Sequence, residues 1–164
     1  MNRISRAFLT FVIVVACAIV SAACRHASSG TAYVPELGEL MAFQQMRYTK
    51  IWLAGQAGNW PLAAYEADEL GEGFDAVVAF HPTHENAPVA PKDAIPRMVT
   101  QPLADLKSAV ARRDGAAFEQ TYDALTTACN NCHQALNYGF LRVQRPEANP
   151  YPSQVFEPPT NDTN

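Results

Sequence analysis

The sequence predicts an all-α protein, an antiparallel bundle of four helices, on two observations. Apolar side chains recur every three to four residues over four long stretches, and no stretch shows a clear strand pattern. Proline, glycine and asparagine gather between these stretches, where they end one helix and allow the next to begin. Because the connections are short, successive helices are expected to run antiparallel.

The first two expected helices cover residues 35–54 and 60–80. The proline at position 35 suits a first helical turn, where its missing N–H leaves no hydrogen bond unmade. Asn59 precedes a first-turn proline and is expected to cap the second helix. Gly71 and Gly73 favour a kink or break in that helix. The apolar face of the first helix comprises Leu37, Leu40, Met41, Gln44, Tyr48, Ile51 and Trp52.

A proline-rich connector at residues 81–91 leads to a third helical stretch at residues 95–113. Because prolines restrict the start of this stretch, its regular part is expected to begin only at Thr100 or Gln101. Asp114 is the expected cap of a fourth helix, which covers residues 116–140. Together these helices define an expected domain over residues 35–144.

The segments outside this domain have other roles. Residues 1–23 combine a basic start, an apolar run and small residues, the order typical of a secretory signal peptide. The apolar run is shorter than the roughly 20 residues of a membrane span. Cleavage would make Cys24 the first residue; its surroundings resemble a bacterial lipobox, although Ser21 replaces the usual leucine. Lipidated Cys24 is the expectation and a free thiol the alternative. Residues 24–34 are the expected tether, and the proline-rich residues 145–164 an extended or disordered tail.

Composition excludes some functions. The formal net charge is −4, and the chain has no basic stripe or run, so a nucleic acid is not an expected partner. Only Cys24, Cys129 and Cys132 remain after signal removal, and the last two are too close in sequence to staple a fold. The cysteines therefore do not indicate a disulfide scaffold.

The sequence Cys-Asn-Asn-Cys-His at residues 129–133 is the strongest functional signal. Two thiols three residues apart on one helical turn can form thioether bonds with the two vinyl groups on one edge of a haem. The adjacent His133 is then placed beneath the iron as a ligand. Export agrees with this interpretation, because haem is attached to cytochromes c outside the bacterial cytoplasm. The motif therefore predicts one covalent haem c on Cys129 and Cys132.

Three other interpretations of the motif stay open. A thioredoxin-like redox pair needs a neighbouring strand-helix unit, and no strand is expected. A structural zinc site needs four ligands, so His81 or His84 would have to join the three in the motif. A simple disulfide between Cys129 and Cys132 is the third. Under the haem interpretation, the haem-free chain is expected to show two nearby thiols and a cavity.

The late position of the motif in a four-helix chain resembles the class II cytochromes c, which include cytochrome c prime and low-spin cytochromes of the c556 type. The resemblance covers about residues 35–140, and its specific part is the motif and its position. It implies that Cys129 and Cys132 hold the haem and that His133 is the proximal ligand. It also implies that two copies of the chain can pair through their first helices.

The resemblance directs attention to the sixth iron ligand. Low-spin members of the family use a methionine of the first helix, whereas cytochrome c prime has an apolar residue there. Met41 lies within the apolar stripe of its helix and Met46 nearly opposite, so Met41 is the expected ligand. The alternative is that Met41 only fills the core.

Other residues have weaker assignments. Arg142 and Arg145 are expected near the haem propionates, because arginine suits carboxylates, or else as surface charges. Tyr138 and Phe140 are expected to pack on the haem edge. The loop histidines, at positions 81 and 84, are expected to be solvated.

The expected function is single-electron transfer in the bacterial periplasm, with exported or membrane-bound redox proteins as partners. No Ser-His-Asp order, phosphate loop or paired-carboxylate site stands out, so no independent enzymatic activity is expected. Two alternatives are a five-coordinate haem that binds nitric oxide or carbon monoxide, and a haem-bearing subunit of a larger complex.

Overall fold

The computed structural model describes residues 33–160 of the 164-residue chain. The expected signal peptide, Cys24 and nearly all of the tether lie outside the described residues. Within them the chain is helical and contains no strand, so the all-α prediction is confirmed. The helices are α2 (Leu37–Gln56), α3 (Trp60–Phe80), α4 (Pro91–Met98), α5 (Thr100–Ala111) and α6 (Gly115–Ala135). None of these helices is long and apolar enough to cross a membrane.

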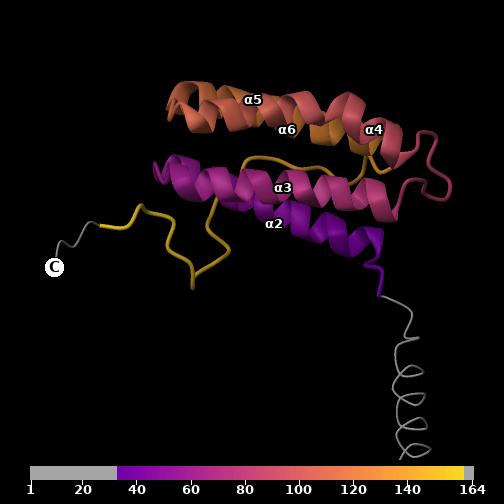
Figure 1. Cartoon of the computed structure of the whole chain (residues 1–164), viewed down its shortest axis with the longest axis horizontal. Coiled ribbons are helices and arrows are strands. Elements are labelled where there is room, and N and C mark those ends of the chain that lie inside the picture. The colour runs from indigo at the N-terminus through magenta and orange to yellow at the C-terminus, as the bar shows by residue number, and fades with distance from the viewer. Residues whose placement is uncertain (1–32, 161–164) are drawn as a thin grey trace, which may run out of the picture. The chain divides into compact units, whose positions relative to one another are not determined.

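Within residues 35–160, the helices pack mainly as sequence neighbours (Figure 1). Helix α2 lies along α3, and α5 lies along α6. Helix α3 also contacts α4 and α5, so it connects the two pairs. The connections within each pair are short, residues 57–59 and 112–114.

The side chains expected to cap the second and fourth helices do so. Asn59 Oδ1 accepts a hydrogen bond from the Leu62 N–H at 3.2 Å, at the start of α3. Asp114 Oδ1 accepts one from the Ala117 N–H at 3.0 Å, at the start of α6. Each bond satisfies one N–H that the first helical turn leaves without a partner.

The third helical stretch differs from the expectation. It begins earlier, at Pro91, and is divided at Val99 into α4 and α5. Pro91 belongs to the first turn of α4 rather than to the connector, because a proline there sacrifices no helical hydrogen bond. The regular second part does begin at Thr100, as expected.

Helix α6 ends at Ala135, five residues before the expected end. Asn137 adopts a left-handed conformation with φ of 67°. The N–H of Tyr138 donates to the His133 carbonyl at 2.7 Å, and the N–H of Asn137 donates to the Gln134 carbonyl at 3.2 Å. This pattern is a Schellman cap, in which asparagine is a common alternative to glycine. It sends the following residues back along α6.

The break expected at Gly71 and Gly73 does not occur, because α3 is one helix through both glycines. A β-carbon at Gly73 would overlap the amide of Gln44 in α2. Glycine at this position therefore serves the close approach of α2 and α3, and the packing between them outweighs its low helix propensity.

The C-terminal tail is non-helical as far as residue 160, and it packs against the helices. Asn59 Nδ2 donates to the Glu157 carbonyl at 3.2 Å. The Lys50 ammonium lies 5.2 Å from the centroid of the Tyr151 ring. Phe156 is only 5% exposed. The prolines thus give an extended segment with its own contacts.

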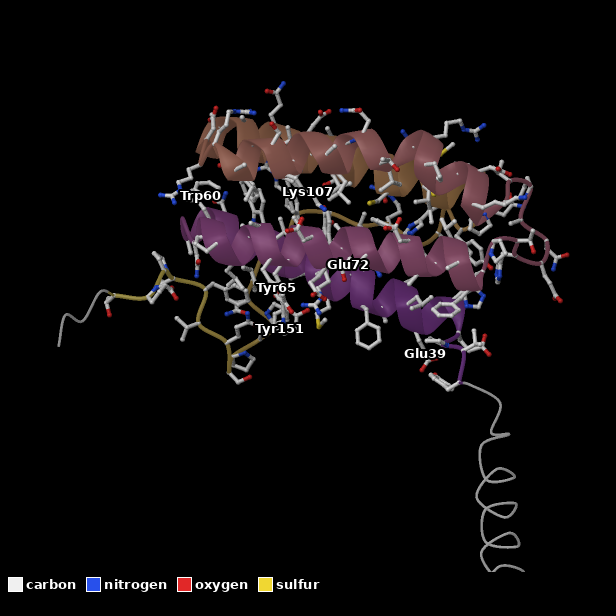
Figure 2. The ribbon with its side chains drawn as sticks, in the orientation of Figure 1. Glu39, Trp60, Tyr65, Glu72, Lys107 and Tyr151 are labelled. Atoms are coloured by element: carbon white, nitrogen blue, oxygen red, sulfur yellow. The ribbon has the colours of Figure 1, made fainter. Side chains whose placement is uncertain are left out.

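One half of the core is filled by aromatic rings. The Tyr122 ring lies 4.6 Å from Tyr48 and 4.9 Å from Trp52, measured between centroids. Phe118 lies 5.9 Å from Trp52 and 5.8 Å from Trp60, in the same measure. Figure 2 shows Trp60 at one end of the helices and Glu39 at the other. We call this aromatic group, near the α2–α3 connection, the packed half of the core.

Candidate functional site

The other half of the core surrounds a cavity of about 710 Å³. Its walls come from the first half of α2, from α3 and α4, from the end of α6 and from the segment that follows α6. This volume lies within the range of small-molecule and cofactor pockets, roughly 300–1,000 Å³. Its lining is mainly apolar, with Leu37, Leu70, Phe74, Val77, Ile95, Val99 and Leu136 among its residues.

The cavity brings together the four residues that the sequence singled out for a haem. Cys129, Cys132 and His133 line it from α6, and Met41 lines it from α2. Met46 does not line it, although it lies on the same helix. The structure therefore distinguishes the two methionines as the helical wheel did, and it leaves Met41 as the one that could reach a group in the cavity.

Cys129 and Cys132 are both free thiols and do not form the disulfide that was one of the alternative interpretations. Burial, with a smaller contribution from the neighbouring Cys132, raises the pKa of the Cys129 thiol to about 12. Burial also raises the pKa of Cys132, whose side chain is 8% exposed. Both groups therefore carry their protons at neutral pH. The pair of nearby thiols beside a cavity is the arrangement expected of a haem-free chain.

His133 has one ring nitrogen committed and one available. Its Nδ1 lies 2.7 Å from the carbonyl oxygen of Leu141. A carbonyl can only accept, so Nδ1 carries the proton and donates, which leaves the Nε2 lone pair free. Metal-binding histidines usually make this second bond, because it fixes the ring and increases the basicity of the ligating nitrogen. The His133 side chain is thus prepared to bind a metal through Nε2.

These features fit a c-type haem. The cavity offers an apolar enclosure, two free thiols on one helical turn, a histidine with its Nε2 available, and a methionine sulfur from a second helix. Imidazole nitrogen and thioether sulfur are both established axial ligands of haem iron.

Of the two arginines, Arg142 lines the cavity and Arg145 does not. Arg145 donates from Nε to Asp123 at 2.6 Å and from Nη1 to Glu119 at 3.2 Å. Its guanidinium lies 4.4 Å from the centroid of the Trp52 ring. Because Arg145 already has these partners, Arg142 is the arginine that could pair with a haem propionate.

The loop histidines were expected to be solvated, but both are half-buried and hydrogen-bonded. His81 Nε2 lies 2.7 Å from the Pro35 carbonyl oxygen. His84 Nε2 lies 2.6 Å from the Tyr138 hydroxyl, and both of these side chains line the cavity. Phe140 lines it as well. No local pattern pairs residues so far apart in sequence, which is why the His84–Tyr138 contact was missed.

Sequence reasoning also missed Asn130, Leu141 and the buried amide of Gln44. Asn130 Nδ2 donates to the Val143 carbonyl at 3.0 Å, and its Oδ1 accepts from the Val143 N–H at 2.9 Å. Gln44 lines the cavity at 6% exposure, and its Oε1 has no hydrogen-bond partner among the described residues. Nothing in the sequence distinguishes Asn130 from Asn131, so a role for Asn130 was not predicted.

Two of the competing interpretations of the motif find no support within residues 33–160. No group of three or more His, Cys, Asp or Glu side chains is placed there to hold a metal ion, so a four-ligand zinc site is not formed. The strand that a thioredoxin-like unit would need is also missing from this part of the chain.

Comparisons of the chain with protein-family models, with curated proteins and with solved structures find no match. The resemblance to class II cytochromes c therefore rests on the motif, its position and the helical pattern.

Proposed function

We propose that this chain is an exported c-type cytochrome that carries one covalent haem and transfers single electrons in the bacterial periplasm. Its helices would form an antiparallel four-helix bundle, with α4 and α5 as one interrupted helix. One observation carries the proposal: Met41, Cys129, Cys132 and His133 line a single apolar cavity, although Met41 is far from the others in sequence. The partners would be exported or membrane-bound redox proteins.

Each of these residues would have a defined task. The thiols of Cys129 and Cys132 add across the two vinyl groups, which gives two thioether bonds. His133 Nε2 and the Met41 sulfur donate to the iron from α6 and α2. The apolar lining excludes water, and that exclusion and the two axial donors tune the potential. The bound haem supplies the one-electron couple.

Covalent attachment is the first test. The full chain is expressed in a host with cytochrome c maturation, then measured by intact mass and a pyridine haemochrome spectrum. We expect one haem per chain, and none in the Cys129→Ala/Cys132→Ala double variant. Cys24→Ala is the matched control: it removes a cysteine outside the motif and is expected to keep the haem. A wild-type mass without haem would contradict the proposal.

The sixth ligand is the second test, and it decides between electron transfer and gas binding. We expect sharp α and β bands in the reduced wild-type spectrum, which Met41→Ala converts to a high-spin spectrum. Met46→Ala is the control on the same helix and is expected to leave the spectrum unchanged. If the wild-type protein has a high-spin spectrum and binds carbon monoxide, the five-coordinate alternative is favoured instead.

A further inference from the structure

Asn130 lies between the two cysteines and contacts the segment that holds His133. Asn130 and His133 are three residues apart in α6, so they occupy neighbouring positions on one face of the helix. Both are bonded to the segment that returns along α6 after its Schellman cap. We call residues 141–145 the return segment.

The bond between Asn130 and the return segment is made at two points. The side-chain amide donates to the Val143 carbonyl at 3.0 Å, and its oxygen accepts from the Val143 N–H at 2.9 Å. Two bonds to one residue fix the orientation of that residue as well as its distance from α6. Two residues earlier in the chain, the Leu141 carbonyl accepts the Nδ1–H of His133 at 2.7 Å.

Among the described residues, the other hydrogen bonds of the return segment lie at its ends, while the Val143 side chain packs against the core. The Leu141 N–H donates to the Tyr138 carbonyl at 2.8 Å, within the turn that follows α6. Arg145 is held by Asp123, through bonds of 2.6 and 2.7 Å. Asn130 acts between these ends, next to the carbonyl that His133 uses.

We propose that Asn130 is a positioning residue for the iron ligand His133. By fixing Val143 it holds the Leu141 carbonyl against Nδ1, and it thereby sets the orientation of the imidazole and the electron donation of Nε2. The first of the two residues between the cysteines is then more than a spacer. This inference rests on the proposed function, because it takes His133 as the iron ligand.

The test compares Asn130→Ala with Asn131→Ala in the full, haem-loaded chain. Asn131 is the second residue between the cysteines and its side chain is exposed, so it is a matched control for helix propensity and cysteine spacing. Two quantities are measured. One is the midpoint potential of the haem. The other is the iron–histidine stretching band in the resonance Raman spectrum of the ferrous form, recorded with both variants in the Met41→Ala background, where the iron is expected to be five-coordinate and high-spin.

We expect Asn130→Ala to weaken the bond to Nδ1, so that Nε2 donates less to the iron. A weaker donor stabilises the ferric form less, so the potential rises and the iron–histidine band moves to lower frequency. Loss of an outer partner of a metal-binding histidine typically changes metal affinity by about ten- to a hundredfold. Asn130 acts one step further away, so we expect about a tenfold change in the ferrous-to-ferric ratio, about 59 mV for one electron. Asn131→Ala is expected to leave both quantities at the wild-type values.

A third measurement separates positioning from folding. Hydrogen exchange at the Val143 amide, followed in the haem-free and the haem-loaded chain, is expected to be faster in Asn130→Ala than in Asn131→Ala. Asn130→Leu keeps the side-chain size while removing both bonds, and it replaces the alanine variant if that variant does not fold.

The outcomes are distinguishable. Faster Val143 exchange together with a raised potential and a shifted band supports the inference. Faster exchange with an unchanged potential and band overturns it, because Asn130 would then be only structural. Equal behaviour of the Asn130 and Asn131 variants in a haem-loaded chain also overturns it and leaves the proposed function intact. A wild-type chain without haem overturns both.

Discussion

Near the α2–α3 connection the core is filled by stacked aromatic rings, whereas near the start of α2 and the end of α6 it surrounds a cavity. The first region is filled by Trp52, Phe118 and Tyr122, of which Phe118 and Tyr122 are fully buried. The second region, which we call the cavity half, encloses about 710 Å³. Protein interiors are normally close-packed. The contrast shows that side chains fill the core in one half, whereas the other half has room for a group such as the proposed haem.

Replacing Phe118 by alanine is expected to give the largest effect in the packed half. The ring is fully buried between Trp52 and Trp60, so its removal loses contacts on all sides. We expect a loss of about 3–5 kcal/mol in the free energy of unfolding, measured by urea denaturation. The loss should be similar with and without haem.

Phe74→Ala is the matched variant in the cavity half, because Phe74 is 8% exposed and lines the cavity. In the haem-free chain part of this ring borders empty space and has fewer contacts to lose. We therefore expect a smaller loss than for Phe118, and a larger loss once the haem is attached. Equal losses in the two states would contradict the division of the core into two halves.

Gly55→Ala is expected to give the next effect. A β-carbon at Gly55 would overlap the Phe118 ring, so the packed half has no room for it. Forcing atoms into a packed core costs about 1–3 kcal/mol, which should exceed the gain in helix propensity. Gly38 lies on the same helix with open space around its α-carbon, so Gly38→Ala is the control. Gly38→Ala is expected to stabilise the protein by about 0.5–1 kcal/mol. Thermal denaturation measures the stability of both variants. A Gly55→Ala variant more stable than the wild type would contradict the prediction.

The elements that local chemistry controls were predictable from the sequence. Asn59 and Asp114 cap their helices because a short side chain with an oxygen can reach a free N–H two or three residues on. The Cys-Asn-Asn-Cys-His motif could also be recognised from the sequence, because its residues are contiguous. The all-α class follows from the same periodicity.

What the sequence did not predict depends on contacts between distant residues. Gly73 looked like a break in α3, yet it admits the Gln44 amide from α2. Helix α6 ends early, at Ala135, because Asn137 adopts the left-handed conformation that closes the cap, and a search for glycine alone does not find such an asparagine. Arg145 was expected near the propionates or as a surface charge, and the sequence did not predict its bond to Asp123. The sequence thus identified the residues that could hold a haem, and the packing showed which of them share a cavity.

The dependence of stability on alkaline pH tests the boundary between the packed half and the cavity half, because two tyrosines lie there. Tyr48 lines the cavity and stacks on Tyr122, and burial raises the pKa of both hydroxyls above the ordinary 10.0. Above pH 10 the unfolded chain loses these protons while the folded chain keeps them, so the free energy of unfolding falls as pH rises. Each tyrosine contributes a slope of about 1.4 kcal/mol per pH unit.

Denaturation with urea at a series of pH values measures this slope. Below pH 10 the stabilising contribution of both hydroxyls is fully present, so the free energy of unfolding should change little with pH on their account. Tyr122→Phe removes one titrating group and is expected to reduce the slope by its share. A slope that is the same in the variant and the wild type would show that Tyr122 does not contribute.

The smallest effect on global stability is expected from Arg145→Gln, although this residue connects the two halves. Arg145 ends the return segment of the cavity half, and its guanidinium lies over Trp52 of the packed half, 4.4 Å from the ring centroid. Its ion pairs with Glu119 and Asp123 are exposed, so water and salt screen them. We therefore expect nearly unchanged unfolding but faster hydrogen exchange at residues 141–145, and the same local change in the wild type at high salt. A large loss of global stability would mean that the packed half depends on the return segment. The expected result would show instead that the cavity half is covered by a segment that can loosen on its own.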